Sequence, residues 1–200
     1  MIIKNPEDEK ANPVIVKAKE TEKVDQSRLD CPLSEEMIKA LVNQFGLELH
    51  NMHLYGSFAN FFGVRGFEKL EKYFKARENE ELRHANWIYY WLTYNDAEFK
   101  YPSIPELTEK WETLEDPFIL TCEAEDITTQ EIYNIADLAL KEGDFITWNW
   151  LNDHNETTGM LVAEQSEEMA ISRTIRDIAG MDDASWIKRQ DLIYDTYFKE

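Results

Sequence analysis

Apolar residues in the first long helical segment recur on one face, at alternating steps of four and three. Ser34 is a suitable N-cap, and Glu35 and Glu36 follow it in the first turn, where negative charge is favourable. The pattern predicts a helix from Ser34 to about Phe62, just before Gly63. Its inward stripe consists of Leu41, Phe45, Glu48, Met52 and Tyr55. A carboxylate therefore interrupts an otherwise apolar face.

The same alternation returns after a short turn and predicts a second helix from Phe67 to about Trp91. Its inward face mixes apolar and polar residues: Phe67, Leu70, Phe74, Arg77, Glu81, His84, Ile88 and Trp91. Residues 94–117 then break the pattern with three prolines, and this segment is long enough to run the length of a bundle. The first two helices are therefore expected to form one hairpin.

Two further helices and a short terminal one follow. The third is predicted from Phe118 to about Leu140, before Gly143, with Glu125 inside its apolar stripe. A fourth reaches Ile178 from an uncertain start between residues 145 and 159, with Gln165 on its inner face. Residues 183–198 suffice for a short fifth helix. The expected fold class is all-α: a four-helix bundle of two hairpins with a long crossover between its second and third helices.

Residues 1–33 differ from the rest of the chain. They lack aromatic residues, contain three prolines and carry lysine and glutamate in near balance, so they can bury little surface. We interpret them as an N-terminal extension, in which residues 14–16 are the only apolar run, and residues 34–200 as one domain.

Each of the four long helices offers a possible metal ligand on its apolar side. These are Glu48, then Glu81 with His84, then Glu125, then Gln165. Several buried carboxylates at close range are costly without a cation, because they cannot all ionise in a medium of low dielectric constant. A bound cation removes that penalty, and oxygen-rich sites with one imidazole suit iron among the redox metals. The four helices together predict a buried metal site.

Each residue also has an ordinary explanation when it is considered alone. His84 can be a core histidine bonded to a neighbour, and Glu48 or Glu125 can pair with Arg77. One guanidinium, however, cannot balance three carboxylates. Tyr55 lies seven residues after Glu48 and so points the same way, where its phenol could hydrogen-bond a ligand or supply an electron, although such a tyrosine is more often simply core.

A second acidic group is predicted beside the first. It consists of Glu80, Glu164, Glu167 and Glu168. Clustered glutamates usually form a solvated helix face, but adjacency to Glu81 and Gln165 favours an additional iron site.

Charge and composition narrow the partners. Acidic residues outnumber basic ones by 40 to 21, and the net charge of -19 disfavours nucleic acids and anionic membranes. The two cysteines show no metal-binding spacing, and the N-terminus lacks the apolar core of a signal peptide, which together indicate a cytoplasmic protein.

From about Leu33 to the end, the chain resembles the bacterial non-haem ferritins. The resemblance rests on residues 36–49, on residues 67–84 with their Glu-x-x-His motif, on Glu125 with the residues at 129–132, and on residues 161–168. It implies a ferritin-like bundle and ferroxidase activity, in which Fe(II) is oxidised by dioxygen or peroxide and stored as ferric mineral. It further implies a dinuclear iron site at Glu48, Glu81, His84 and Glu125, with Gln165 and Tyr55 adjacent, a third site at Glu80, Glu164, Glu167 and Glu168, and a homo-oligomeric shell of 24 subunits.

The chain departs from this family in three ways. It has about seven additional residues around positions 152–159, which could be two turns of helix or a loop. The N-terminal extension is unusual. Bacterioferritins carry a methionine after the second-helix glutamate and a second Glu-x-x-His motif, whereas here Leu82 follows Glu81 and Glu164 leads to Glu167, so we expect no haem.

Three rival functions are considered. A rubrerythrin-like peroxidase would need a cysteine-rich domain, and a DNA-protecting mini-ferritin commonly has a basic tail, whereas residues 1–33 are nearly neutral. The third rival is a metal-free structural or interaction protein in which Arg77 neutralises part of the site.

Overall fold

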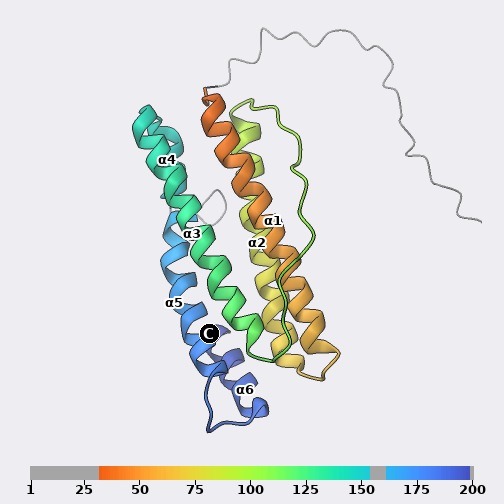
Figure 1. Ribbon diagram of the computed structural model, residues 1–200. Coiled ribbons are helices and arrows are strands. Elements are labelled where there is room, and N and C mark those ends of the chain that lie inside the picture. Colours follow the sequence, from red (N-terminus) through yellow and green to blue (C-terminus); the bar gives the residue numbers. More distant parts are fainter. Residues whose placement is uncertain (1–31, 154–160, 199–200) are drawn as a thin grey trace, which may run out of the picture.

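The computed structural model describes residues 32–153 and 161–198, and these residues contain six helices and no strand. The helices are α1 (Glu35–Gly63), α2 (Glu68–Tyr94), α3 (Asp116–Glu142), α4 (Phe145–Leu151), α5 (Leu161–Ala179) and α6 (Trp186–Tyr197). The expected all-α bundle with a short C-terminal helix is confirmed (Figure 1). Residues 1–31, including the apolar run at 14–16, lie outside the described part.

Helices α1 and α2 form the expected hairpin, and they pack against each other along their length. Helix α1 begins after Ser34, whose hydroxyl accepts a hydrogen bond of 2.9 Å from the amide of Met37. The turn back into α2 includes Gly66 at a φ of 79°, a left-handed conformation in which glycine meets no steric penalty.

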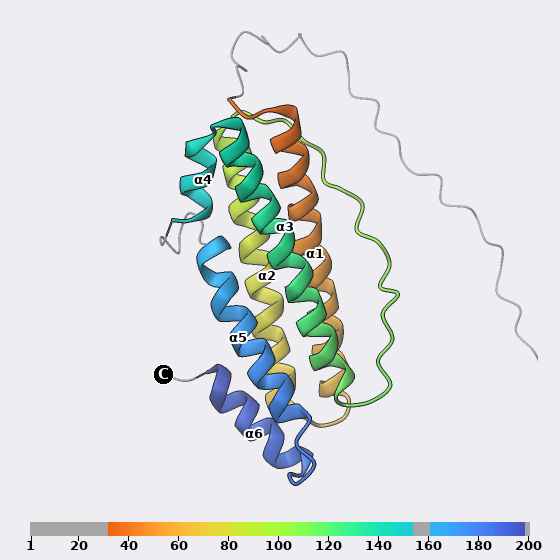
Figure 2. The same ribbon diagram turned by 60° about the vertical axis from the view of Figure 1, so that its left-hand side comes forward.

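The crossover between α2 and α3 runs along the outside of the bundle beside α1, as Figure 2 shows. Our prediction placed Pro117 in this connection and began the helix at Phe118, but α3 begins at Asp116 and includes Pro117 in its first turn. Proline is tolerated there because the first amides of a helix have no intrahelical acceptor. The helix ends at Gly143, which has the left-handed conformation at φ 72°.

The fourth helix is divided within the described residues. Helix α4 ends at Leu151, and the Asn152 side chain donates to the carbonyl oxygen of Trp148 at 2.7 Å. Helix α5, which carries Gln165, begins at Leu161. Asn152 and Asp153 already leave the helical conformation, whereas residues 154–160, which include most of the predicted insertion, lie outside the described part. Stacking of Trp91 on Trp150, with ring centroids 4.7 Å apart, ties α4 to α2.

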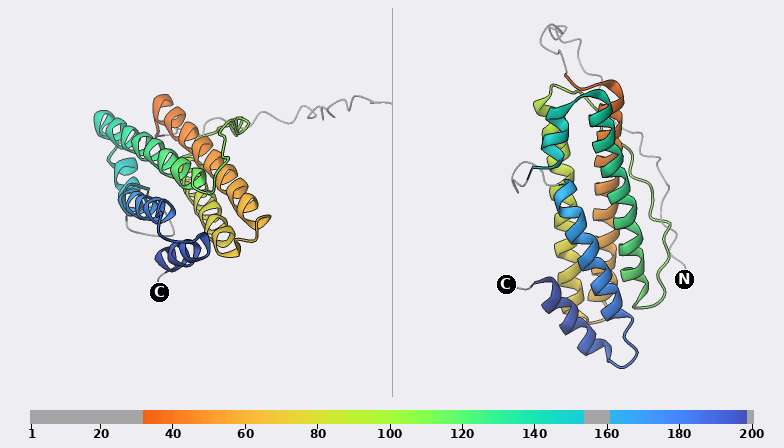
Figure 3. Two further views of the ribbon diagram at one scale, coloured as in Figure 1. Left: turned by 60° about the horizontal axis from the view of Figure 1, so that its bottom comes forward. Right: turned by 90° about the vertical axis from the view of Figure 1, so that its left-hand side faces the viewer.

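Helix α6 lies against α2 and α5 at one end of the bundle (Figure 3). The buried guanidinium of Arg189 joins α6 to the end of α5, since it donates to the carbonyl oxygens of Ala179 at 2.5 Å and Ala184 at 2.8 Å. The bond to Ala179 satisfies a carbonyl group that the end of α5 leaves without an intrahelical partner.

Two apolar clusters fill the bundle. One surrounds Phe45, Ile88 and Ile132, and the other surrounds Phe58, Phe74 and Phe118. Because the buried glutamates fall in the sequence between the two sets, α1, α2 and α3 each present a polar level between two apolar ones. None of the described helices is long and apolar enough to span a membrane.

Candidate metal centre

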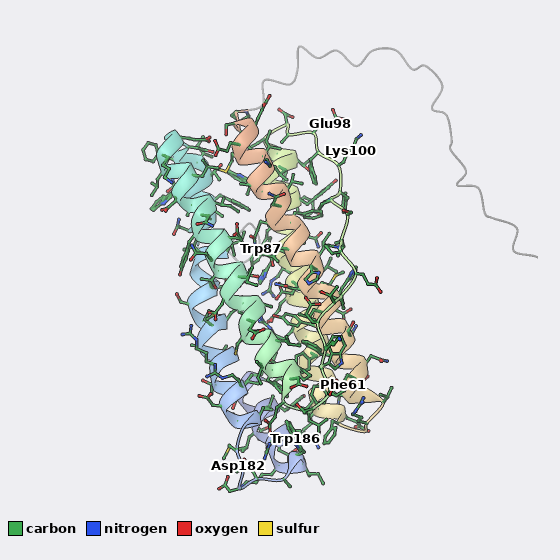
Figure 4. All side chains as sticks on the ribbon, viewed as in Figure 1. Phe61, Trp87, Glu98, Lys100, Asp182 and Trp186 are labelled. Atoms are coloured by element: carbon green, nitrogen blue, oxygen red, sulfur yellow. The ribbon has the colours of Figure 1, made fainter. Side chains whose placement is uncertain are left out.

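The five residues predicted as ligands or neighbours of a buried centre lie in the interior. Glu48, Glu81, His84, Glu125 and Gln165 are each at most 1% exposed. They come from α1, α2, α3 and α5, whose parallel courses are visible in Figure 1. Trp87, which is labelled in Figure 4, lies one helical turn after His84 near the middle of the bundle, and its ring centroid is 5.2 Å from that of the imidazole.

Two groups among the described residues could hold a metal ion: Glu48, Glu81 and His84, and His84 with Glu164 and Glu168; the first is formed by predicted ligands of the buried centre alone. In this first group each residue offers a ligand atom within 4.8 Å of the other two, and the Nδ1 atom of His84 lies 3.8 Å from an oxygen of each glutamate. Two of these buried atoms, Glu48 Oε2 and His84 Nδ1, have no hydrogen-bond partner. Buried polar atoms left unpaired are costly, so atoms facing one another in this way fit a cation held between them.

Neighbouring side chains orient this group. Gln44 lies one turn before Glu48 and donates from Nε2 to Glu48 Oε1 at 2.6 Å, which leaves Oε2 facing the imidazole. On the other side of the ring, Nε2 of His84 lies 2.8 Å from Glu164 Oε2. A proton on Nε2 then leaves the Nδ1 lone pair available to a metal ion, as in carboxylate–histidine–metal arrangements.

A second group surrounds Arg77 on α2, which is buried. Its guanidinium makes a close ion pair with Glu125, and it lies 3.5 Å from Glu81, 2.8 Å from Glu80 and 3.4 Å from Glu168. Tyr55 also donates a short hydrogen bond to Glu125. The ordinary pairing of Glu125 with Arg77, considered from the sequence, is therefore present.

Burial shifts the pKa values of several titratable groups in this centre. It raises the pKa of Glu81 to about 7 and that of Glu168 to about 7, and it also raises the pKa of Glu125, although Arg77 opposes the shift. Burial lowers the pKa of His84, but the nearby carboxylates, led by Glu168, raise it well above its usual value. These groups hold protons that a metal ion must displace.

Gln165 links α5 to α3 and to the acidic group. Its side-chain oxygen accepts a hydrogen bond of 2.6 Å from Thr129, and its Nε2 donates to Glu168 Oε2 at 3.1 Å. Thr129 and Gln44 were not predicted as site residues. Their spacing to Glu125 and Glu48, one turn in each case, was the signal that could have indicated them.

The four glutamates of the second acidic group lie around one cavity but differ in burial and in their partners. Glu168 is buried beside Arg77, Glu164 contacts His84, Glu80 contacts Arg77, and Glu167 is exposed. All four line a cavity of about 380 Å³ between α2, α5 and α6. Arg77 and Arg83 also line it, so the cavity is less acidic than its glutamates alone would make it.

Comparison with known proteins gives consistent matches. A family model described as a ferritin-like domain matches residues 38–177. The bacterial non-heme ferritin of Campylobacter jejuni is 27% identical over 72% of this chain and 83% of its own length, and that of Escherichia coli is 26% identical over 72% and 84%.

Solved structures show the same likeness. An open pore ferritin of Archaeoglobus fulgidus aligns with a TM-score of 0.72 at 26% identity, covering 81% of this chain and 96% of that one. A humanized archaeal ferritin aligns with a TM-score of 0.74 at 25% identity, covering 84% and 99%.

Proposed function

The chain belongs to the ferritin-like family, and from this premise we propose that it stores iron, oxidising Fe(II) at the buried centre and keeping the product as ferric mineral. The observation that carries the proposal is the group of Glu48, Glu81 and His84, in which two unpaired buried atoms face each other across two helices. Oxygen ligands with one imidazole suit Fe(II). The names of the bacterial relatives support the same conclusion.

In this proposal a first Fe(II) is bound by Glu48, Glu81 and the Nδ1 atom of His84. A second is bound between Glu81 and Glu125, with Gln165 and Tyr55 adjacent. Glu80, Glu164, Glu167 and Glu168 form a third site that leads to the stored mineral. The cavity of about 380 Å³ that these four residues line supports a route for iron between the centre and the surface.

The chemistry uses the metal as the reductant. Each of two Fe(II) ions loses one electron, and dioxygen accepts both electrons with two protons to leave hydrogen peroxide. When hydrogen peroxide is the oxidant, it accepts two electrons and two protons and yields two water molecules. The protein holds the ions at fixed positions and excludes water. Its carboxylates, whose pKa values burial raises, release protons when the ions bind and then stabilise the greater charge of the ferric product.

The remaining parts of the proposal are inherited from the family. We propose a homo-oligomeric shell of 24 subunits in the cytoplasm, without haem, without nucleic acid and without membrane attachment. Exposed apolar side chains such as Tyr94, Phe145 and Ile146 support burial of these surfaces between subunits. We retain residues 1–33 as an extension to the domain of residues 34–200.

The test is oxidation of Fe(II) by the purified full-length protein in air. Ferric absorbance should develop faster than in buffer, and the product should stay soluble with a large assembly. His84→Ala should remove most of the acceleration. His53→Ala, which changes an exposed histidine on α1, is the matched control and should keep it.

One observation favours a second candidate, a metal-free structural bundle: the contacts of Arg77 with four carboxylates. In that case the wild-type protein would oxidise Fe(II) no faster than buffer, and His84→Ala would change nothing. A small oligomer in a mass measurement would further support this candidate and contradict storage.

A further inference from the structure

Arg77 occupies an unusual place, because its guanidinium lies between three helices that each contribute a carboxylate. Its Nη2 atom contacts Glu125 Oε1 and lies 3.5 Å from Glu81 Oε1, while its Nη1 atom lies 3.4 Å from Glu168 Oε1. These carboxylates come from α3, α2 and α5 respectively. A single cation therefore already fills the space that they share.

The two halves of the centre are consequently unequal. In the first half, Glu48 Oε2 and His84 Nδ1 are buried without partners and face each other. In the second half, Arg77 already holds the Oε1 atoms of Glu125 and Glu81, and Glu125 Oε2 is the buried oxygen left without a hydrogen-bond partner beside this guanidinium. Glu81 belongs to both halves, since its Oε1 atom faces Arg77 and its Oε2 atom faces His84.

We propose that Arg77 is a built-in competitor for the second metal ion, so that the centre loads its two ions in order and with unequal affinity. This inference rests on the proposed iron site. The first ion displaces a proton from His84 but meets no guanidinium. The second must displace a guanidinium that is held by charge-assisted hydrogen bonds, and these are stronger than hydrogen bonds between neutral groups.

The structure offers Arg77 a place to go when it is displaced. Its Nη1 atom already contacts Glu80 Oε2 at 2.8 Å, and the Glu80 side chain is 25% exposed. Arg77 and Glu80 both line the cavity between α2, α5 and α6, beside Glu167. A rotation of the side chain into this cavity keeps the guanidinium paired while it releases Glu81 and Glu125.

Titration of the assembled protein with Zn(II), followed by calorimetry, tests this order without any redox reaction. The wild type should bind one ion per chain tightly and a second roughly ten- to hundredfold more weakly, a difference that corresponds to the strength of hydrogen bonds with charged groups. Arg77→Gln removes the competing charge, so the second affinity should rise about tenfold or more. The matched control is Arg173→Gln, which removes an exposed arginine whose ion pair with Asp126, at 3.4 Å, lies outside this cavity. It should behave like the wild type.

The outcomes separate the two proposals. If both ions bind the wild type equally, or if Arg77→Gln leaves the second affinity unchanged, the competitor role is wrong while the metal site stands. If neither protein binds Zn(II), the site itself and this inference both fail.

Crystals of the wild type give an answer that does not depend on the folding of a variant. At low Zn(II) the anomalous signal should lie beside His84 alone, with Arg77 in the position described here. At high Zn(II) a second peak should appear near Glu125, with Arg77 turned toward Glu80. Two peaks of equal occupancy at low Zn(II) would overturn the proposal.

Discussion

The Nε2 atom of His84 lies 2.8 Å from Glu164 Oε2, so a carboxylate from α5 contacts the ring nitrogen that does not face Glu48 and Glu81. This contact leaves Nδ1 directed at Glu48 and Glu81. Glu164, which the sequence assigned to a separate acidic group, thus also orients a residue of the central one. Such partners of a ligand fix the tautomer and the ring orientation of a histidine.

Replacement of Glu164 should therefore weaken the first metal position. We expect Glu164→Ala to lower the affinity of the tighter Zn(II) site by about 10- to 100-fold, the usual cost of losing such a partner, and Glu164→Gln to lower it less because an amide oxygen still accepts the Nε2 proton. Calorimetric titration measures both values. Glu167→Ala, on the same helix but exposed, is the control. Equal effects of the Glu164 and Glu167 substitutions would contradict the orienting role.

The metal-free protein should lose stability as the pH rises. Glu81 and Glu168 have an ordinary pKa of 4.5 and a pKa of about 7 in the folded protein, because burial disfavours their charged forms. The folded state therefore binds more protons than the unfolded state between these values, so the contribution to stability is present below about pH 4.5 and is lost as the pH rises through about 7.

Melting temperatures across this range test the sign. We expect them to fall by roughly 5 °C between pH 5 and pH 7.5, and to recover when Zn(II) is added at the higher pH. The double substitution Glu81→Gln and Glu168→Gln should flatten the dependence, since the amides do not titrate. An unchanged slope in that variant would show that other groups control the pH response.

Two buried tyrosines allow a matched comparison. The Tyr55 hydroxyl donates to Glu125, whereas the Tyr73 hydroxyl has no hydrogen-bond partner. Tyr55→Phe should lower the free energy of unfolding of the metal-free protein by about 1.5–3 kcal/mol, the usual contribution of a hydrogen bond to a charged group. Tyr73→Phe should cost nothing measurable or stabilise slightly. Urea unfolding curves measure both, and equal losses would contradict this assignment.

Arg189 should contribute more to stability than an exposed arginine does. Arg189→Met keeps the apolar stem but removes the hydrogen bonds to the carbonyl oxygens of Ala179 and Ala184, so we expect a loss of about 2 kcal/mol. Arg173→Met removes an exposed ion pair with Asp126 and should cost less than about 0.5 kcal/mol. Thermal unfolding distinguishes them. A negligible effect of Arg189→Met would mean that α6 is held mainly by its apolar contacts.

Periodicity predicted most of the fold because the apolar positions of each helix indicate which of its faces is buried. The apolar stripes indicated α1, α2, α3 and α6 to within a few residues, and they placed Glu48, Glu81, His84 and Glu125 on buried faces. The start of α3 was predicted incorrectly at Pro117, because a proline is compatible both with a loop and with the first turn of a helix. The break after Leu151 was left open between helix and loop, since local propensities there were weak.

The pattern of residues along the chain was enough to predict that several acidic groups and one imidazole share the interior of a helical bundle. The pairs of atoms in contact became known from the packed helices: Glu164 contacts His84, Gln44 donates a hydrogen bond to Glu48, and Arg77 forms an ion pair with Glu125. The physical reason is that helical periodicity sets the direction of a side chain around its own axis. Contacts between helices depend on their relative height and on the rotamers that long side chains adopt within the packed core.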